Sequence, residues 1–200
     1  MTVAQKIDPR APGKQCGSCT LCCKLLGISA LGKPMDQWCS HCEIGRGCRI
    51  YDKRPEACAE FFCLFLMHGG LSEVWRPSNS KIVLTADADH NSIVANVDPD
   101  RPRAWRRDPF YKTLKEWSVA ARPQNGRVVV RIGRKMIVIF PNKDVDLGIV
   151  ADDEVICVKQ TLTDGGIVCD AFKMKRDDPR ARASKALSEE VVAHPNFKPS

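Results

Sequence analysis

The chain has 200 residues, of which 44% are hydrophobic, so it can bury a core and wholesale disorder is excluded. Its 31 basic and 24 acidic residues give a net charge of +7, which permits an acidic partner such as nucleic acid. No apolar run approaches the roughly 20 residues of a membrane helix, and the N-terminal segment lacks the apolar region of a signal peptide. We therefore expect a cytoplasmic protein with no membrane partner.

Cysteine dominates the first part of the chain. Nine of the eleven cysteines follow the spacing C-x2-C-x2-C-C-x15-C-x2-C-x5-C-x9-C-x4-C. In a secreted protein this density would indicate a disulfide scaffold, but cytosolic thiols stay reduced, and an odd number leaves one thiol unpaired. Coordination of a soft metal therefore explains the pattern better. The predicted metal ligands are Cys16, Cys19, Cys22, Cys23, Cys39, Cys42, Cys48, Cys58 and Cys63.

The end of this cysteine-rich region predicts a short helix from Tyr51 to Cys63, broken near its start by Pro55. Such a helix would present Cys58 and, a turn or more later, Cys63. The apolar residues in and after it are expected to pack as core, and they are Phe61, Phe62, Phe65 and Leu66.

The middle of the chain predicts strands rich in Val and Ile and bounded by Gly, Pro, Asp or Asn. Tight turns at 132–135 and 163–166 would join neighbouring strands, which favours antiparallel pairing. One helix is expected from Asp108 to about Ala121, with Pro109 in its first turn. The predicted strands are Lys81–Ala86, Ser92–Val97, Arg127–Ile132, Lys135–Phe140, Glu154–Thr161 and Gly166–Lys173.

The remaining two cysteines lie in the last two predicted strands. If the final turn pairs Leu162 with Ile167, then Cys157 faces Phe172 and Cys169 faces Gln160, so the two thiols are not partners. Free cysteine is among the most buried residue types, and we expect both to pack as small apolar side chains.

Together these elements indicate an α+β protein. A small cysteine-rich metal-binding module with few short helices, residues 1–70, would pack on a mainly antiparallel β-sheet with one or two helices, residues 71–173. A polar tail over 174–200 would follow, with a short helix at Ser184–Ala193.

The cysteine spacing limits the cofactor to zinc or iron, the latter alone or in an iron–sulfur cluster. Four thiolates in a tetrahedron suit all of these. Cys16, Cys19 and Cys22 match the first three positions of a ferredoxin run, but Cys23 follows immediately where the fourth position would come later. Because adjacent side chains point apart, Cys22 and Cys23 would serve two metals, unless one of them bridges or only packs.

Two other side chains near the cysteines are candidates for the site. His41 lies inside a C-x2-C pair and could replace a thiolate, the alternative being an exposed turn residue. Arg54 could donate hydrogen bonds to metal-bound sulfur, or it could pair with Glu56 or Glu60.

Two segments carry a family resemblance. CGSCTLCC from Cys16 to Cys23, and GCRIYDKRPEACAEFFC from Gly47 to Cys63, resemble the YkgJ-type CxxCxxCC cysteine-cluster family over about residues 14–66. The resemblance implies bound zinc or iron but does not fix a reaction. Some larger proteins with similar clusters are flagellin lysine methylases, an activity not expected here because the chain shows no glycine-rich nucleotide loop.

Three functions are compatible with these features. The first is a metal-binding protein in which zinc or iron stabilises the cysteine-rich module. The second is an iron–sulfur or thiolate-iron redox protein, or an enzyme accessory factor with a protein partner. The third, a zinc-dependent nucleic-acid-binding protein, is disfavoured because the C2H2 pattern is missing and the basic run at 101–107 is short.

Overall fold

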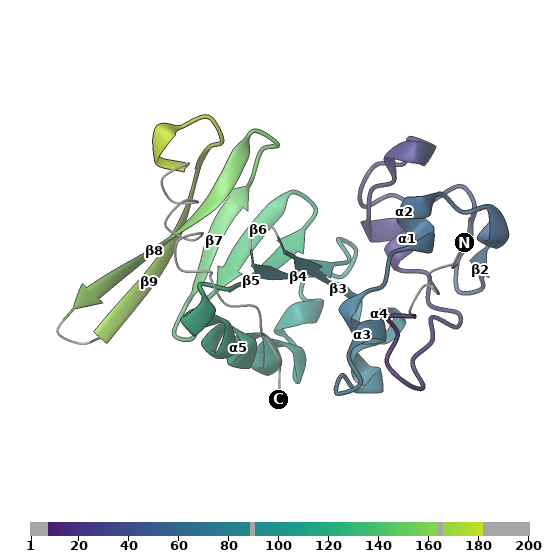
Figure 1. The fold of residues 1–200 in the computed structure, drawn as a ribbon, viewed down its shortest axis with the longest axis horizontal. Helices are drawn as coiled ribbons and strands as arrows, with labels where there is room; N and C mark the ends of the chain where they lie inside the picture. The colour runs from purple at the N-terminus through teal and green to yellow at the C-terminus, as the bar shows by residue number, and fades with distance from the viewer. Residues whose placement is uncertain (1–7, 89–90, 164–165, 182–200) are drawn as a thin grey trace, which may run out of the picture. The chain divides into compact units, whose positions relative to one another are not determined.

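The protein divides into two compact units in the computed structural model (Figure 1). The first unit comprises Met1–Ala86 with Val94–Tyr111, and the second comprises Asp87–Ile93 with Lys112–Ser200. The expected domain limits at residues 70 and 173 stay a prediction. The structure describes residues 8–88, 91–163 and 166–181, and the helix expected at Ser184–Ala193 lies outside them.

The cysteine-rich part of the first unit is built from very short elements. No helix in its described residues exceeds four residues, and its two strands have two residues each. Such elements bury little apolar surface, so their positions depend on side chains and loops. They are α1 (Cys22–Leu25), η1 (Ser29–Leu31), β1 (Cys42–Glu43), β2 (Gly47–Cys48), η2 (Tyr51–Lys53), α2 (Glu56–Ala59) and α3 (Leu64–Met67).

The single helix expected from Tyr51 to Cys63 is wrong. Residues 51–63 form η2, then α2, and then a non-helical stretch before α3. Arg54 and Pro55 both have extended backbone, with ψ of 141° and 149°, because a proline disfavours helical geometry in the residue before it. Cys58 therefore lies within α2, whereas Cys63 is the extended residue that precedes α3.

The apolar core of the first unit includes Phe65 and Leu66 of α3 and is completed by the elements that follow. Phe65 and Leu66 are buried as expected, with 1% and 3% of their surface exposed, whereas Phe61 and Phe62 are half-buried. Trp75 packs edge-on against Phe110, with ring centroids 4.8 Å apart. The elements that carry this core are η3 (Glu73–Trp75), α4 (Pro77–Ser80), β3 (Ile82–Asp87), β4 (Ser92–Val97) and η4 (Ala104–Arg106).

The strands confirm an α+β fold with mainly antiparallel sheets. A five-stranded sheet has the order β3-β4-β5-β6-β7, and β1-β2 and β8-β9 form two-stranded hairpins. All six expected strands are present, and the expected helix begins two residues late. The remaining elements are α5 (Phe110–Ala121), η5 (Arg122–Gln124), β5 (Arg127–Ile132), β6 (Lys135–Ile139), β7 (Asp144–Ile149), β8 (Glu154–Thr163) and β9 (Gly166–Lys175).

Within the five-stranded sheet, β7 is the strand that the sequence pattern did not predict. Its sequence, DVDLGI, contains two aspartates and a glycine, which are depleted in strands. Gly148 has a φ of +63° close to a register shift between Met136 and Ile137 of the paired strand β6. The strand therefore forms because it pairs with β6 and because Gly148 allows the register shift, although its own residues have low strand propensity.

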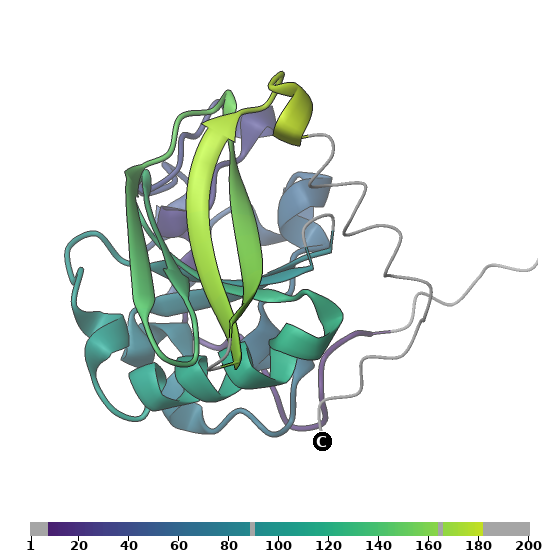
Figure 2. The ribbon, with the colours of Figure 1, turned by 90° about the vertical axis from the view of Figure 1, so that its left-hand side faces the viewer.

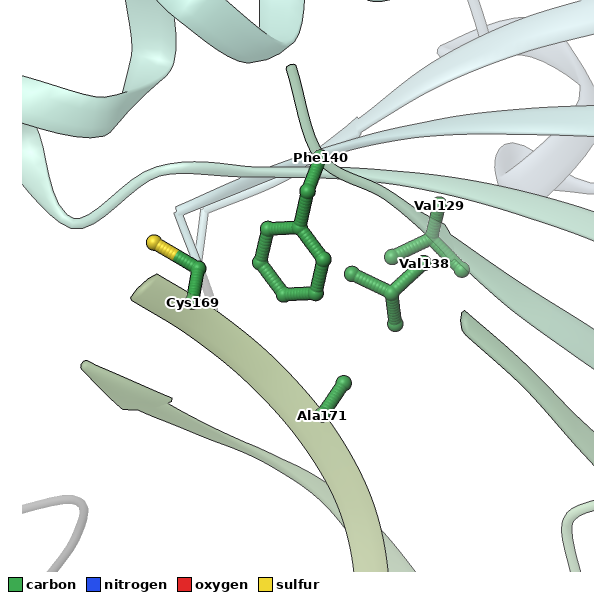
Figure 3. Packing of buried hydrophobic residues seen from close by; sticks show 5 residues of the cluster. All are labelled: Val129, Val138, Phe140, Cys169 and Ala171. Atoms are coloured by element: carbon green, nitrogen blue, oxygen red, sulfur yellow. The ribbon is translucent and has the colours of Figure 1, made fainter. Parts of the chain in front are cut away.

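The β8-β9 hairpin has the register expected from its sequence. Cys157 pairs with Phe172, and Gln160 pairs with Cys169. Both cysteines are buried, which confirms that they pack in the interior. Figure 2 shows this hairpin in front of the strands β5–β7, and Figure 3 shows how Cys169 and Ala171 of β9 pack with apolar side chains of the sheet, which are Val129, Val138 and Phe140.

Candidate metal centre

Eight of the nine predicted ligands line one cavity in the first unit. The cavity has a volume of about 530 Å³, and all eleven cysteines are free thiols. Cys63, the ninth, lines a smaller neighbouring cavity of about 80 Å³ together with Cys16, Cys19, Cys22 and Cys58. The cysteines around the larger cavity are Cys16, Cys19, Cys22, Cys23, Cys39, Cys42, Cys48 and Cys58.

Backbone pairing gathers four of these cysteines on one side. The N–H of Cys39 donates to the carbonyl of Cys23 at 3.0 Å, and the N–H of Cys42 donates to the carbonyl of Cys39 at 3.0 Å. Cys42 also faces Cys48 across the β1-β2 hairpin. Cys58 joins them from α2, since its thiol interacts electrostatically with Cys23, Cys39 and Cys48. We call Cys23, Cys39, Cys42, Cys48 and Cys58 the second thiol group.

A different set of contacts brings the remaining four cysteines together. The N–H of Cys19 donates to the carbonyl of Cys16 at 3.0 Å, which closes the first C-x2-C turn. Arg76 braces this turn, because its Nη1 donates to the carbonyls of Gln15 at 2.8 Å and Cys16 at 3.1 Å. Cys63 and Cys22 each interact electrostatically with Cys16 and Cys19, and all four line the smaller cavity. We call Cys16, Cys19, Cys22 and Cys63 the first thiol group.

Cys22 and Cys23 are the point at which the two groups meet. The thiol of Cys22 donates a hydrogen bond to Cys23, which raises the pKa of Cys22 and lowers that of Cys23. Burial raises the pKa of Cys16, Cys58 and Cys63, and it raises the pKa of Cys42 to about 11. Most of these thiols thus need a cation, from metal or protein, to become thiolates.

Arg54 is the cation placed most centrally. It lines both cavities, and its guanidinium lies 3.7 Å from the centre of the Tyr51 ring. Its Nε is buried and has no hydrogen-bond partner within the described part of the chain. A buried donor without an acceptor is costly, so this position suits an anionic group such as metal-bound sulfur.

A second cation, Lys33, was not identified from the sequence. Its ammonium group is buried and donates to the carbonyls of Lys24 at 3.0 Å, Leu26 and Pro34 at 2.9 Å. Burial lowers the pKa of Lys33, while the charges of Cys39 and Cys23 favour its protonated form. No sequence pattern marks this residue, because its burial depends on the loop that folds around it.

The other candidates have separate outcomes. His41 lines the larger cavity, as a ligand would, but across residues 8–88, 91–163 and 166–181 no three His, Cys, Asp or Glu side chains converge closely enough to hold a metal ion.

In the basic run at 101–107, Trp105 is buried and Arg106 stacks on it at 4.2 Å. Its aromatic ring is therefore not available to stack on a nucleic-acid base.

Comparison with protein-family models, with curated proteins and with solved structures gives no match. Among the helices that the structure describes, none combines the length and apolar character needed to cross a membrane.

Proposed function

We propose that this protein binds zinc or iron through the nine cysteines of its first unit. The observation that carries the proposal is a cavity lined by eight free thiols beside a buried Arg54 Nε that has no partner in the described residues. Thiolates are the ligands that zinc and iron–sulfur centres prefer. When bound, the metal would supply cross-links between segments that have little apolar core of their own.

The donor set fits such a metal in number and in kind. Four thiols complete a tetrahedral site, and the first thiol group has that number. The second thiol group has five, which is one thiol more than a single tetrahedral ion requires, and His41 lines the same cavity. Because no three described donors converge, binding requires the thiols to move together, which segments of four residues or fewer permit.

We therefore assign two sites, one to each thiol group. Cys22 and Cys23 are adjacent on α1, yet Cys22 lines both cavities and Cys23 lines only the larger one. Arg54 lines both cavities and could donate to sulfur in either site. The resemblance of residues 14–66 to the YkgJ-type family implies zinc or iron as the metal, and the assignment of two sites rests on the two thiol groups alone.

An iron–sulfur or thiolate-iron redox protein is the second candidate. It is favoured by the fifth thiol of the second group, which is one more than a single tetrahedral ion takes. Colour distinguishes the two, because iron–thiolate centres absorb visible light and zinc does not.

The test is elemental analysis and a visible spectrum of protein purified without oxygen. We expect zinc or iron in the unaltered chain, and loss of one site's share of metal in Cys19→Ser and, independently, in Cys42→Ser. Cys157→Ala, which removes a buried thiol of β8, is the matched control and should retain all metal. Unchanged metal content in both serine variants, or a metal-free parent protein, would contradict the proposal.

A further inference from the structure

A cavity in the second unit has no part in the proposed metal chemistry. It has a volume of about 500 Å³ and is lined by residues of β5, β6, β8 and β9 and of the segment that ends α5. This volume lies in the range of small-molecule sites. Its apolar wall is formed by Val128, Val138, Phe140, Val158, Cys169 and Phe172, and Figure 3 shows three of them, Val138, Phe140 and Cys169, packed around one another.

The polar part of the lining is cationic. Arg122, Arg127, Lys159 and Arg180 line the cavity, and no Asp or Glu of the described residues does. Arg180 is already paired, because its Nη2 lies 2.7 Å from a carboxylate oxygen of Asp178. Of the three other cations, Arg122 and Arg127 are the ones best placed to bind a negatively charged group.

Arg122 provides the strongest indication that the cavity binds an anion. It belongs to η5 and is half-buried, and its guanidinium has neither a hydrogen bond nor an ion pair within the described residues. Holding a guanidinium at an apolar wall without an acceptor is unfavourable, whereas a carboxylate or phosphate would accept two hydrogen bonds from it. Lys159, on β8, is exposed beside the same cavity and pairs across the hairpin with Asp170, so its charge is already partly balanced.

Arg127 reinforces this arrangement from the floor of the cavity. Its Nη1 donates to the carbonyl of Ile156 at 2.8 Å, which fixes the guanidinium in place and leaves other N–H groups to donate. Burial lowers the pKa of Arg127, and only the charges of Cys157 and Asp87 oppose this effect. An additional anion would therefore stabilise its charged form.

We propose that this cavity binds a small organic anion with an apolar body. Its carboxylate or phosphate head would lie beside Arg122 and Arg127, and its alkyl or aromatic body would lie against Phe140 and Val138. The two features are complementary, since the wall excludes inorganic ions as sole ligands and the cations disfavour neutral apolar molecules.

Calorimetric titration of the full-length, metal-loaded chain tests this proposal with four probes: decanoate, decyl phosphate, decanol and inorganic phosphate. We expect decanoate or decyl phosphate to bind, and their relative affinities identify the head group. Decanol and inorganic phosphate should bind at least tenfold more weakly. Equal binding of decanol and decanoate, or binding of inorganic phosphate as tight as that of decyl phosphate, would overturn the proposal.

Two variants locate the binding. Arg122→Gln should weaken the preferred probe about tenfold, the loss expected for one charge-assisted hydrogen bond. Arg134→Gln removes the same charge from an exposed side chain of the same unit that does not line the cavity, and it should leave the affinity unchanged. If Arg122→Gln lowers the melting temperature, Lys159→Gln replaces it. Equal affinities in the parent, Arg134→Gln and the cavity variant would overturn the proposal.

Discussion

Two regions of the molecule are stabilised in different ways, namely the cysteine-rich part of the first unit and the whole of the second unit. Residues 8–68 contain helices of four residues or fewer and strands of two, whereas the second unit has a 12-residue helix and strands of up to ten residues. Burial of Val and Ile on long strands is enough to hold the second unit together. The cysteine-rich part has few such residues, so its thiols and buried cations must supply what apolar burial does not.

Removal of metal should produce the largest difference between these two regions. If the thiols hold metal as proposed, a chelator under reducing conditions should unfold residues 16–63 and leave β5 and β6 folded, because structural zinc contributes about 10–16 kcal/mol in small domains. Hydrogen exchange measured by mass spectrometry would show loss of protection in the cysteine-rich peptides alone. Undiminished protection of those peptides in metal-free protein would refute the contrast.

The opposite perturbation acts on the apolar core of the second unit. Leu114, on α5, is fully buried, and Leu114→Ala should lower the free energy of unfolding by about 2–5 kcal/mol, since it leaves a cavity. Val119→Ala on the same helix is the control, because 57% of Val119 is exposed. Urea unfolding gives both values, and metal content should not change. Equal stabilities of the two variants would show that this core is not what holds the unit.

A buried ion pair sharpens the comparison within the first unit. Lys24 follows Cys23 on α1, and its ammonium lies 2.6 Å from carboxylate oxygens of both Asp98 and Asp100. Burial alone would lower the pKa of Lys24, but the hydrogen bonds to Asp100 and Asp98 outweigh it and raise the pKa.

Lys24→Met should therefore destabilise the protein by about 3 kcal/mol, because it leaves the carboxylate of Asp98 buried without its cation. Chemical denaturation measures the loss. Lys81→Met, at a lysine outside this ion pair, should have a smaller effect. A Lys24→Met protein as stable as its parent would mean that the ion pair contributes nothing net.

The smallest expected effect concerns Arg54. Arg54→Gln should weaken metal affinity about tenfold to a hundredfold without abolishing binding, because the residue would contact sulfur and not the metal. Lys53→Gln, at the exposed neighbouring position, removes the same charge and should have little effect. Competition with a chromophoric chelator gives both affinities. Equal affinities for the two variants would assign Arg54 a structural role through its stacking on Tyr51.

The strands of the second unit were largely predictable because their signals are local. Runs of Val and Ile between turn residues mark β5, β6, β8 and β9, and the turn chemistry sets the β8-β9 register that keeps Cys157 and Cys169 apart. Strand β7 was missed because pairing with β6 overrides the poor strand propensity of its aspartates and glycine.

In the cysteine-rich part the sequence predicted which residues are candidate ligands, but it did not predict how they are arranged in space. The spacing alone identified nine candidate ligands, His41 and Arg54, and ten of these eleven line the larger cavity. The helix expected over Tyr51–Cys63 failed because Pro55 and the stretch after α2 interrupt it. Lys24 and Arg76 carried no signal, since each acquires its role from a segment 60 or more residues away. Lys33 carried none because its burial depends on how the neighbouring loop folds around it.

The sequence by itself therefore determined the candidate donor atoms, the α+β character and the register of the β8-β9 hairpin, because these depend on residue type, on a period of two and on short turns. Only the tertiary structure decided which thiols share a cavity, where Arg54 and Lys33 are buried, and that Arg122 and Arg127 meet at one apolar wall. Those arrangements depend on how whole segments pack, and several of them join residues tens of positions apart, so local preference does not determine them.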